Sequence, residues 1–312
     1  MLAAFLFASC TGKSTGPTDS SPVDSLPKDP DTVVHAIYGA YGIDSGFYSG
    51  VKLGLLSPTT LVEASGLAAS RSHPGMLWTH NDSGNPNYVF LIDSTAVVRA
   101  TYSLDGCANR DWEDIAIGPG PVPGQNYIYV GEIGDNKAKN PSSFVYRFIE
   151  PSGALDTTGA LKHITSIDKI NFVYPDGPHN AETLMVDPLT KDIYIASKGP
   201  VVNLYVARYP QPVDSLFTAK ELATLPLSTL TAGDISPSGS EIVMRNYVQI
   251  YYWKKAANQT ISMALQQTPE LLPYSPEAQG EAICWSPNGD AYYTTSEYAN
   301  NVVAPLFIYR RK

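Results

Sequence analysis

Short runs of apolar and aromatic residues recur along this chain, and clusters of Gly, Pro, Ser and Asn separate them. Runs of this length, bounded by turn residues, are typical of β-strands joined in hairpins. No stretch keeps the 3.6-residue period of an amphipathic helix. The pattern therefore predicts an all-β protein.

Five segments of the sequence are similar to one another and indicate an internal repeat. They are residues 64–68, 112–116, 181–185, 232–236 and 280–284. Their second residues are Ser65, Glu113, Glu182, Gly233 and Glu281, which lie 48, 69, 51 and 48 residues apart. A repeat of about 50 residues is typical of β-propeller blades, small four-stranded sheets that each pack against two neighbours.

The runs that follow each segment complete the expected blades. Second strands are expected at 77–79, 127–130, 192–196, 241–244 and 291–294, and third strands at 88–92, 144–148, 204–208, 249–253 and 306–310. Fourth strands are expected at 97–104, 169–174, 221–225 and 269–274. The last unit lacks a fourth strand, which residues 50–56 can supply to close the ring. We expect five blades, with six as the alternative if the long interval between 113 and 182 holds another blade.

The beginning of the chain has the composition of a signal and a tether. Residues 1–10 are mainly apolar and small, and residues 7–10 resemble the lipobox at which bacterial lipoproteins are cleaved and acylated on cysteine. This resemblance implies a lipid anchor at Cys10; the alternative is an ordinary buried cysteine. Residues 11–46 are assigned to a disordered tether and 47–312 to one propeller domain. We expect a protein of the cell envelope that touches the membrane through its lipid alone.

Composition narrows the class of partner. The formal net charge is -9 and only 16% of the residues are charged, which argues against nucleic acid as a partner because a phosphate backbone requires clustered Lys and Arg. Two further cysteines, Cys107 and Cys284, are too few for a disulfide framework. We expect a monomer.

The five repeated positions predict a site at one mouth of the central channel. The first strand of each blade lines the channel, so Ser65, Glu113, Glu182 and Glu281 should meet around the axis. Carboxylates that face one another repel unless a cation lies between them. Ca²⁺ accepts six to eight oxygen ligands and suits this set. The alternative is a water-filled channel in which the acids are solvated or protonated.

A second group should reach the same mouth from the ends of the second strands and the neighbouring loops. The expected ligand-binding residues are His80, Asn81, Asp82, Arg110, Asn136, Lys198, Arg245, Asn246 and Glu297. Arg110, Lys198 and Arg245 beside a metal would suit an anion such as phosphate. Glu132 and Asp135 are the candidate catalytic residues, which would orient a water molecule.

The order Ser, Glu, Glu, Gly, Glu around five blades resembles the calcium-activated nucleotidases (apyrases), in which a Ser, Glu, Glu, Ser, Glu ring holds Ca²⁺. The resemblance implies metal ligands at Ser65, Glu113, Glu182 and Glu281 and hydrolysis of nucleoside di- and triphosphates, while Gly233 departs from the pattern. Residues 78–84 and 111–116 are also similar to uncharacterised exported bacterial propellers. Two functions stay open, a non-catalytic propeller that binds a small polar or anionic ligand or a partner protein, and a Ca²⁺-dependent phosphohydrolase. We expect the first, because nothing in the sequence requires a nucleophile or a base.

Overall fold

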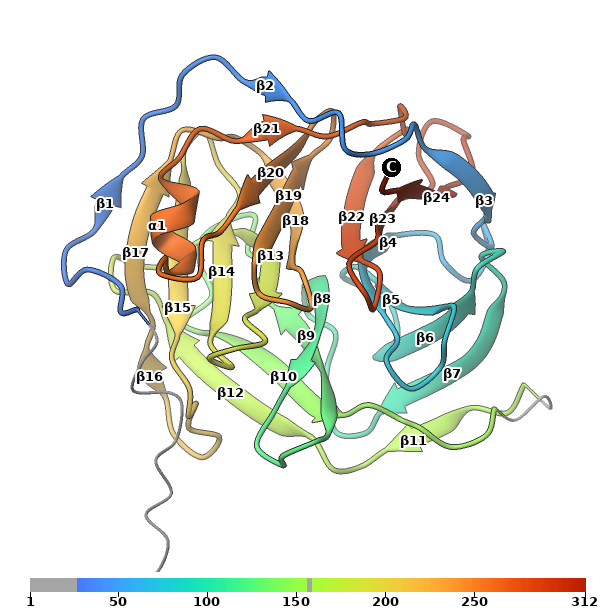
Figure 1. Ribbon diagram of the computed structural model, residues 1–312. Helices are drawn as coiled ribbons and strands as arrows, with labels where there is room; N and C mark the ends of the chain where they lie inside the picture. Colours follow the sequence, from blue (N-terminus) through green and yellow to red (C-terminus); the bar gives the residue numbers. More distant parts are fainter. Residues whose placement is uncertain (1–26, 156–158) are drawn as a thin grey trace, which may run out of the picture.

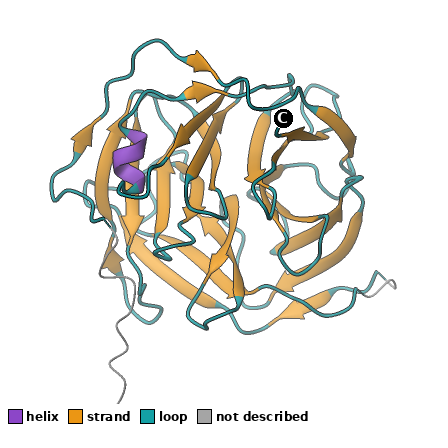
Figure 2. Cartoon of the chain, viewed as in Figure 1, coloured by secondary structure: helices purple, strands orange, loops and turns teal. Residues whose placement is uncertain are grey.

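The computed structural model describes residues 27–155 and 159–312, and these form an all-β propeller (Figure 1). Five sheets stand around a central axis, as the repeat predicts. Strands account for nearly all of the regular structure (Figure 2). The expected signal at residues 1–10, with its lipid anchor at Cys10, and the first part of the expected tether lie outside the described residues.

Each blade is a meander of antiparallel strands numbered outward from the axis. Blade 1 contains β4 (Ala64–Ala69), β5 (Met76–Asn81), β6 (Tyr88–Asp93) and β7 (Val98–Leu104). Blade 2 contains β8 (Trp112–Pro119), β9 (Asn126–Glu132), β10 (Ser143–Ile149) and β12 (Asp168–Val173). Blade 3 contains β13 (Ala181–Val186), β14 (Ile193–Ser197), β15 (Val202–Ala207) and β17 (Lys220–Leu225). Blade 4 contains β18 (Leu230–Ile235), β19 (Glu241–Asn246), β20 (Ile250–Lys254) and β21 (Glu270–Leu271).

Blade 5 is built from both ends of the described chain. It contains β22 (Gly280–Trp285), β23 (Ala291–Ser296) and β24 (Pro305–Arg310), and its fourth strand is β3 (Val51–Leu55). β3 pairs antiparallel with β24, so the predicted closure of the ring by residues 50–56 is confirmed. The closure satisfies the edge of the last blade and joins the two ends of the domain.

The long interval in the repeat does not form a sixth blade, so that alternative is wrong. Its extra residues leave blade 2 and place β11 (Lys162–Ile164) parallel to β7 at the outer edge of blade 1. β16 (Phe217–Thr218) pairs in the same way with β12. Extra chain is thus used to cover sheet edges, which would otherwise present unpaired N–H and C=O groups.

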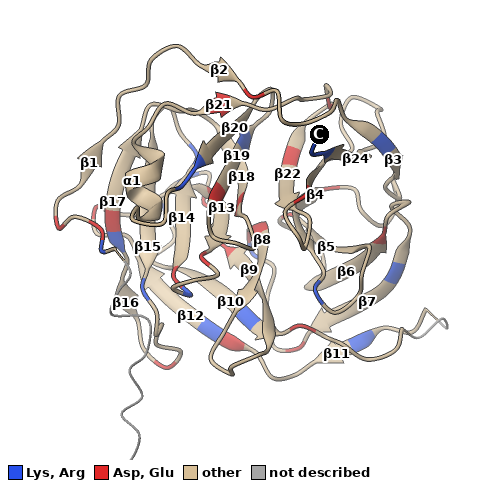
Figure 3. Cartoon of the chain, in the orientation of Figure 1, with Lys and Arg blue, Asp and Glu red and all other residues tan. Residues whose placement is uncertain are grey.

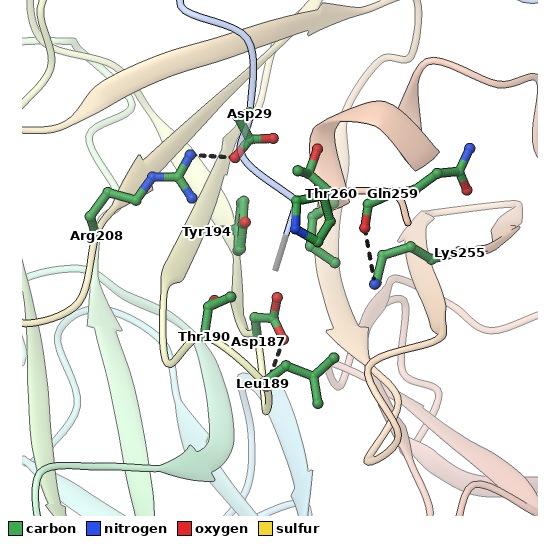
Figure 4. A pocket seen from close by; sticks show the side chains of 11 residues that line it. Asp29, Asp187, Leu189, Thr190, Tyr194, Arg208, Lys255, Gln259 and Thr260 are labelled. Atoms are coloured by element: carbon green, nitrogen blue, oxygen red, sulfur yellow. Dashed lines mark hydrogen bonds and ion pairs between the residues drawn. The ribbon is translucent and has the colours of Figure 1, made fainter. Parts of the chain in front are cut away.

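Part of the segment assigned to a tether also covers sheet edges. β1 (Val34–His35) pairs parallel with β17, and β2 (Gly42–Ile43) pairs parallel with β21. Upstream of β1, the Asp29 carboxylate binds the Arg208 guanidinium (Figure 4). It also accepts a hydrogen bond from the Ser262 hydroxyl. The composition of 11–46 did not reveal this because backbone pairing at an edge needs few apolar side chains.

The core consists of apolar layers between neighbouring blades rather than one central cluster. Trp78, Trp112 and Trp285 are fully buried, and the rings of Tyr292 and Tyr309 stack with centroids 4.5 Å apart. A short helix in blade 4, α1 (Ile261–Leu265), has too few residues to show a period in the sequence. Of the helices described, none is long and apolar enough to cross a membrane.

Candidate functional site: an acidic channel mouth

A polar cavity of about 200 Å³ opens where the inner strands begin. β4, β8, β13, β18 and β22 pack side by side around the axis, so residues at their first positions converge. We call this cavity the acidic mouth and define it by its lining. The lining residues are Glu63, Ser65, Asp82, Glu113, Asn136, Glu182, Lys198, Tyr247, Gln279, Glu281 and Glu297.

The structure brings together all four residues that the sequence assigned to a metal ring. Ser65, Glu113, Glu182 and Glu281 each lie at a break in the pairing of an inner strand with its neighbour. Such a β-bulge turns one extra side chain away from the regular alternation of the strand. Here each bulge directs a polar side chain into the mouth, one from each of blades 1, 2, 3 and 5.

In the fourth blade, the residue at the bulge lies two positions earlier in the sequence than the alignment predicts. Its bulge lies between Leu230 and Ala232, so Thr231 rather than Gly233 is the equivalent of Glu182 and Glu281. The Thr231 hydroxyl donates a hydrogen bond to the Gly280 carbonyl oxygen at 3.1 Å. Gly233 lies further along β18, where a Cβ atom would be 2.9 Å from Cγ2 of Thr183. Gly233 therefore allows blades 3 and 4 to approach, and the alignment there was wrong.

The spacing of the turns contains the signal that the alignment missed. Glu182 precedes the Asp187-Pro188 turn by five residues, and Glu281 precedes the Ser286-Pro287 turn by five. The same count from Ser236 leads to Thr231. The first strand of a blade has a fixed length between the mouth and the turn. Counting back from the turn therefore aligns the blades better than matching the small residues around the bulge.

A second tier of the mouth takes one residue from the chain after each second strand. These residues are Asp82, Asn136, Lys198, Tyr247 and Glu297. Four of them were expected from the sequence. Tyr247 was missed because of the same two-residue shift, since it follows Thr231 by the 16 residues that separate Glu182 from Lys198.

Two residues expected in blade 4 lie away from the mouth. Arg245 is completely buried, and its Nη1 atom lies 2.7 Å from Oε2 of Glu277. Its charge is thus neutralised between blades 4 and 5. Asn246 fixes the turn after β19, where its side-chain oxygen accepts hydrogen bonds from the backbone N–H groups of Val248 and Gln249.

The expected catalytic pair is not part of the lining either. Both oxygens of Glu132 accept hydrogen bonds, from the Arg110 backbone N–H at 2.9 Å, the Arg110 Nε–H at 3.0 Å and the Asp111 N–H at 2.8 Å. The Asp135 carboxylate accepts a hydrogen bond from the Asn140 N–H at 2.6 Å. Arg110, Glu132 and Asp135 thus hold the loops of blade 2 instead of facing the cavity.

His80 and Asn81 support the mouth from within blade 1. His80 is completely buried against Trp112, with ring centroids 5.7 Å apart, and burial lowers its pKa to about 4. It is therefore neutral at physiological pH. The Asn81 side chain accepts a hydrogen bond from the Glu63 N–H and donates one to the Thr60 carbonyl oxygen, which fixes the loop before β4.

The charge of the mouth is strongly unbalanced. Its lining carries six carboxyl groups, from Glu63, Asp82, Glu113, Glu182, Glu281 and Glu297. Among the residues that the structure describes, Lys198 is the only Lys or Arg in the lining. Figure 3 shows acidic positions in red on the inner strands around the axis. A cavity of this kind attracts cations and repels a bare anion.

Burial and mutual repulsion raise the pKa values of these acids. Burial first, and then the charges of Glu182 and Glu297, raise the pKa of Glu281 to about 8. The pKa of Glu297 rises to about 7 for the same kinds of reason. The pKa of Glu113 lies well above its ordinary value, because of burial and the nearby charges of Glu182 and Asp82. Ionisation of all these acids near neutral pH is therefore unfavourable without a positive partner.

Side chains that donate to the acids of the mouth lie on one side of it. Lys198 Nζ lies 2.5 Å from Oε2 of Glu182 and donates a hydrogen bond to the Tyr247 hydroxyl at 2.7 Å. Gln279 donates through Nε2 to Glu281 at 3.0 Å and to Glu297 at 2.5 Å. Both contacts lie on the blade 3 to blade 5 side.

On the opposite side, three carboxyl groups come together, and in the described part of the chain no Lys or Arg nitrogen lies within 4.0 Å of their oxygens. One oxygen each of Asp82, Asp111 and Glu113 lies within 4.8 Å of the others. Asp111 was not assigned as a ligand from the sequence. Gly134 makes room for the group, because a Cβ atom there would lie 2.1 Å from Oε1 of Glu113 and 2.6 Å from Oδ2 of Asp111. Oxygens bound to one Ca²⁺ at about 2.4 Å are at most about 4.8 Å apart, so this donor set fits the ion.

Neither a scan against models of known protein families nor a search of curated proteins finds a match to this chain. The geometry of the mouth is therefore the basis for the functional argument.

Proposed function

We propose that this protein binds a divalent cation, calcium by its ligand preference, at the acidic mouth, and that it binds a small polar or anionic ligand through that ion. The observation that carries the proposal is the group of Asp82, Asp111 and Glu113, whose oxygens lie within 4.8 Å of one another beside a cavity of about 200 Å³. The donors are all oxygens, which favours calcium over zinc.

The ion would resolve the electrostatic conflict of the mouth. Six carboxyl groups face one amine, and burial penalises their ionised forms. A dication at Asp82, Asp111 and Glu113 would allow these groups to ionise together. Ser65 lies next to Glu113 around the ring and could contribute its hydroxyl oxygen.

The rest of the mouth would serve the ligand. Lys198, Tyr247 and Asn136 stand on the second tier and present an amine, a phenol and an amide to the same cavity. These groups donate hydrogen bonds to oxygen atoms of a ligand, and the ion would supply the positive charge that an anion needs. We propose binding rather than catalysis, since Glu132 and Asp135 are held by other contacts.

Calcium titration of the purified protein tests this proposal. We expect saturable binding in isothermal titration calorimetry and a rise in melting temperature with calcium, as mass action requires. Glu113→Gln should weaken binding at least about tenfold, because it removes one charged ligand of a hard cation. The matched control Glu132→Gln should leave calcium binding in place. No calcium binding by the unmodified protein would overturn the proposal.

A second candidate function, a Ca²⁺-dependent phosphohydrolase, gains support from one observation. With Thr231 in the fourth blade the ring has the order Ser, Glu, Glu, Thr, Glu, and a hydroxyl replaces the glycine that departed from the nucleotidase pattern. An assay on nucleoside di- and triphosphates, with calcium and with a chelator, separates the two functions. Chelator-sensitive phosphate release would favour the hydrolase, and calcium binding without release would favour the binding protein.

We also propose that the protein is exported and held at the membrane by a lipid on Cys10, on the basis of residues 7–10. Metabolic labelling with a fatty-acid analogue tests this directly. The Cys10→Ser variant should lose the label and leave the membrane fraction.

A further inference from the structure

The opposite end of the channel has a different chemistry. A cavity of about 270 Å³ lies where the inner strands end, and we call it the far mouth. Its lining is aliphatic and proline-rich and, within residues 27–155 and 159–312, contains one charged residue. The lining residues are Arg71, Ile117, Gly118, Pro119, Asn126, Val186, Pro188, Ile235 and Pro237.

The rim of the far mouth is built from repeated proline turns. Turns begin at Asp187-Pro188, Ser236-Pro237 and Ser286-Pro287, and the turn of each of these blades lies against the next. A Cβ atom on Gly239 would lie 2.8 Å from the Leu189 side chain, so the turns of blades 3 and 4 are in close contact. Proline fixes the backbone of each turn. The rim is thus rigid, which reduces the entropy lost on binding a ligand.

Arg71 is held across this opening. Its backbone N–H donates to the buried Glu150 carboxylate at 3.0 Å, and its Nη1 donates to the Pro287 carbonyl oxygen at 2.6 Å. The side chain therefore reaches from blade 1 to the turn of blade 5. In the described part of the chain, no carboxylate lies within 4.0 Å of its guanidinium, unlike those of Arg110, Arg147 and Arg208.

The surroundings of Arg71 define the ligand that would fit. A guanidinium has five N–H donors in a planar fork that matches a carboxylate. One of these donors serves Pro287. The remaining lining offers aliphatic surface from Val186, Ile235 and the prolines. The volume lies just below the usual range of ligand pockets, which indicates a small occupant.

We propose that the far mouth binds a small aliphatic carboxylate, with the carboxylate on Arg71 and the alkyl chain against Val186, Ile235 and Pro237. This site is separate from the acidic mouth and does not depend on the calcium proposal. The proposed site is formed by the proline turns and Arg71, which are not part of the acidic mouth.

Binding of hexanoate tests the proposal, measured by calorimetry on the full domain with a chelator present to keep the acidic mouth free of metal. We expect saturable binding of hexanoate, and none of hexylammonium, which has the same chain and the opposite charge. Arg71→Gln should weaken hexanoate binding at least about tenfold by removing the charge-assisted hydrogen bonds. Arg99→Gln, in a surface ion pair with Asp93, is the matched control and should bind as the unmodified protein does.

A pair of substitutions on the rim keeps the test independent of any effect of Arg71 on folding. Pro237 is half-buried at the rim, so Pro237→Glu places a second negative charge beside the ligand and should weaken hexanoate binding more than Pro237→Gln, which loses the same alkyl contact without adding a charge. Melting curves establish that both variants are folded. The proposal is overturned if hexanoate does not bind, if hexylammonium binds equally well, or if Arg71→Gln or Pro237→Glu binds hexanoate normally.

Discussion

Lys198 Nζ lies 2.5 Å from Oε2 of Glu182, and this ion pair occupies one side of the acidic mouth. The ammonium group also donates a hydrogen bond to the Tyr247 hydroxyl at 2.7 Å. Lys198 comes directly after β14, and Glu182 from the bulge of β13 in the same blade. Blade 3 thus carries its own ion pair, whereas in the described residues no Lys or Arg nitrogen lies within 4.0 Å of the carboxylates of Asp82, Asp111 and Glu113. This asymmetry places the proposed cation toward blades 1 and 2 instead of on the axis.

Replacing Lys198 should strengthen cation binding. In Lys198→Gln the positive charge that repels an incoming dication is gone, and Glu182 becomes free to face the ion. We expect calcium to bind about tenfold more tightly, measured by calorimetry. Lys139→Gln removes the same charge from an exposed position on a loop of blade 2 and should change binding little. Unchanged or weaker calcium binding by Lys198→Gln would contradict the assigned place of this residue.

Gly134 should be essential for the cation site but not for the fold. Gly134→Ala puts a methyl group where Oε1 of Glu113 and Oδ2 of Asp111 now lie, so the two carboxylates must separate. We expect calcium binding to fall by at least about tenfold while the far-ultraviolet circular dichroism spectrum is unchanged. Gly153→Ala is the control, because a Cβ atom there meets nothing within 4 Å. Normal calcium binding by Gly134→Ala would show that the site lies elsewhere.

Stability without metal should fall as the pH rises. The acids of the mouth have ordinary pKa values near 4.5 in the unfolded chain, and values of about 7 for Glu182 and Glu297 and about 8 for Glu281 in the folded protein. The folded state therefore holds more protons between these values and loses stability as they leave. The lowered pKa of His80 opposes this effect only up to about pH 7.5, because above that the side chain is almost entirely neutral in the unfolded chain as well.

We expect the melting temperature in chelator to drop by about 5 °C between pH 6.5 and pH 9. Calcium should reduce the drop, and so should Glu281→Gln, which cannot ionise. Glu270→Gln, on the outer strand β21, should behave like the unmodified protein. A melting temperature that is flat or rises over this range would show that the mouth acids do not repel one another in the metal-free protein.

The buried ion pair between Arg245 and Glu277 should be a major contributor to stability. Both side chains are completely inaccessible to solvent, so Arg245→Met leaves an unpaired buried carboxylate. We expect a loss of about 3–5 kcal/mol in the free energy of unfolding, measured with urea. Arg311→Met breaks the partly exposed pair with Glu241 and should cost about 1 kcal/mol or less. Equal losses in the two variants would contradict this assignment.

Much of the fold follows from the sequence because each blade repeats one pattern. The five groups of strands and the closing role of β3 were all predictable from apolar runs and turns. The parallel outer strands β1, β2, β11 and β16 were not, because they add backbone hydrogen bonds at sheet edges without a characteristic side-chain pattern.

The site was predictable where a bulge and a turn keep a constant spacing. Ser65, Glu113, Glu182 and Glu281 all reach the mouth, and so do Asp82, Asn136, Lys198 and Glu297. In blade 4 the alignment placed Gly233 at the mouth because Ala232 and Gly233 resemble the small residues of the other segments. Thr231 and Tyr247, which occupy the positions of Glu182 and Lys198, were therefore missed. Arg110 and Glu132 were placed near the mouth by position alone, and sequence spacing could not show that they bind each other.

The most direct test of the central claim is a crystal structure of the protein grown with calcium, measured at a wavelength where calcium scatters anomalously. The account predicts an anomalous peak bounded by oxygens of Asp82, Asp111 and Glu113, with Lys198 still on the opposite side of the mouth. A mouth that contains only water at saturating calcium, or a peak bound by none of these three carboxylates, would contradict it.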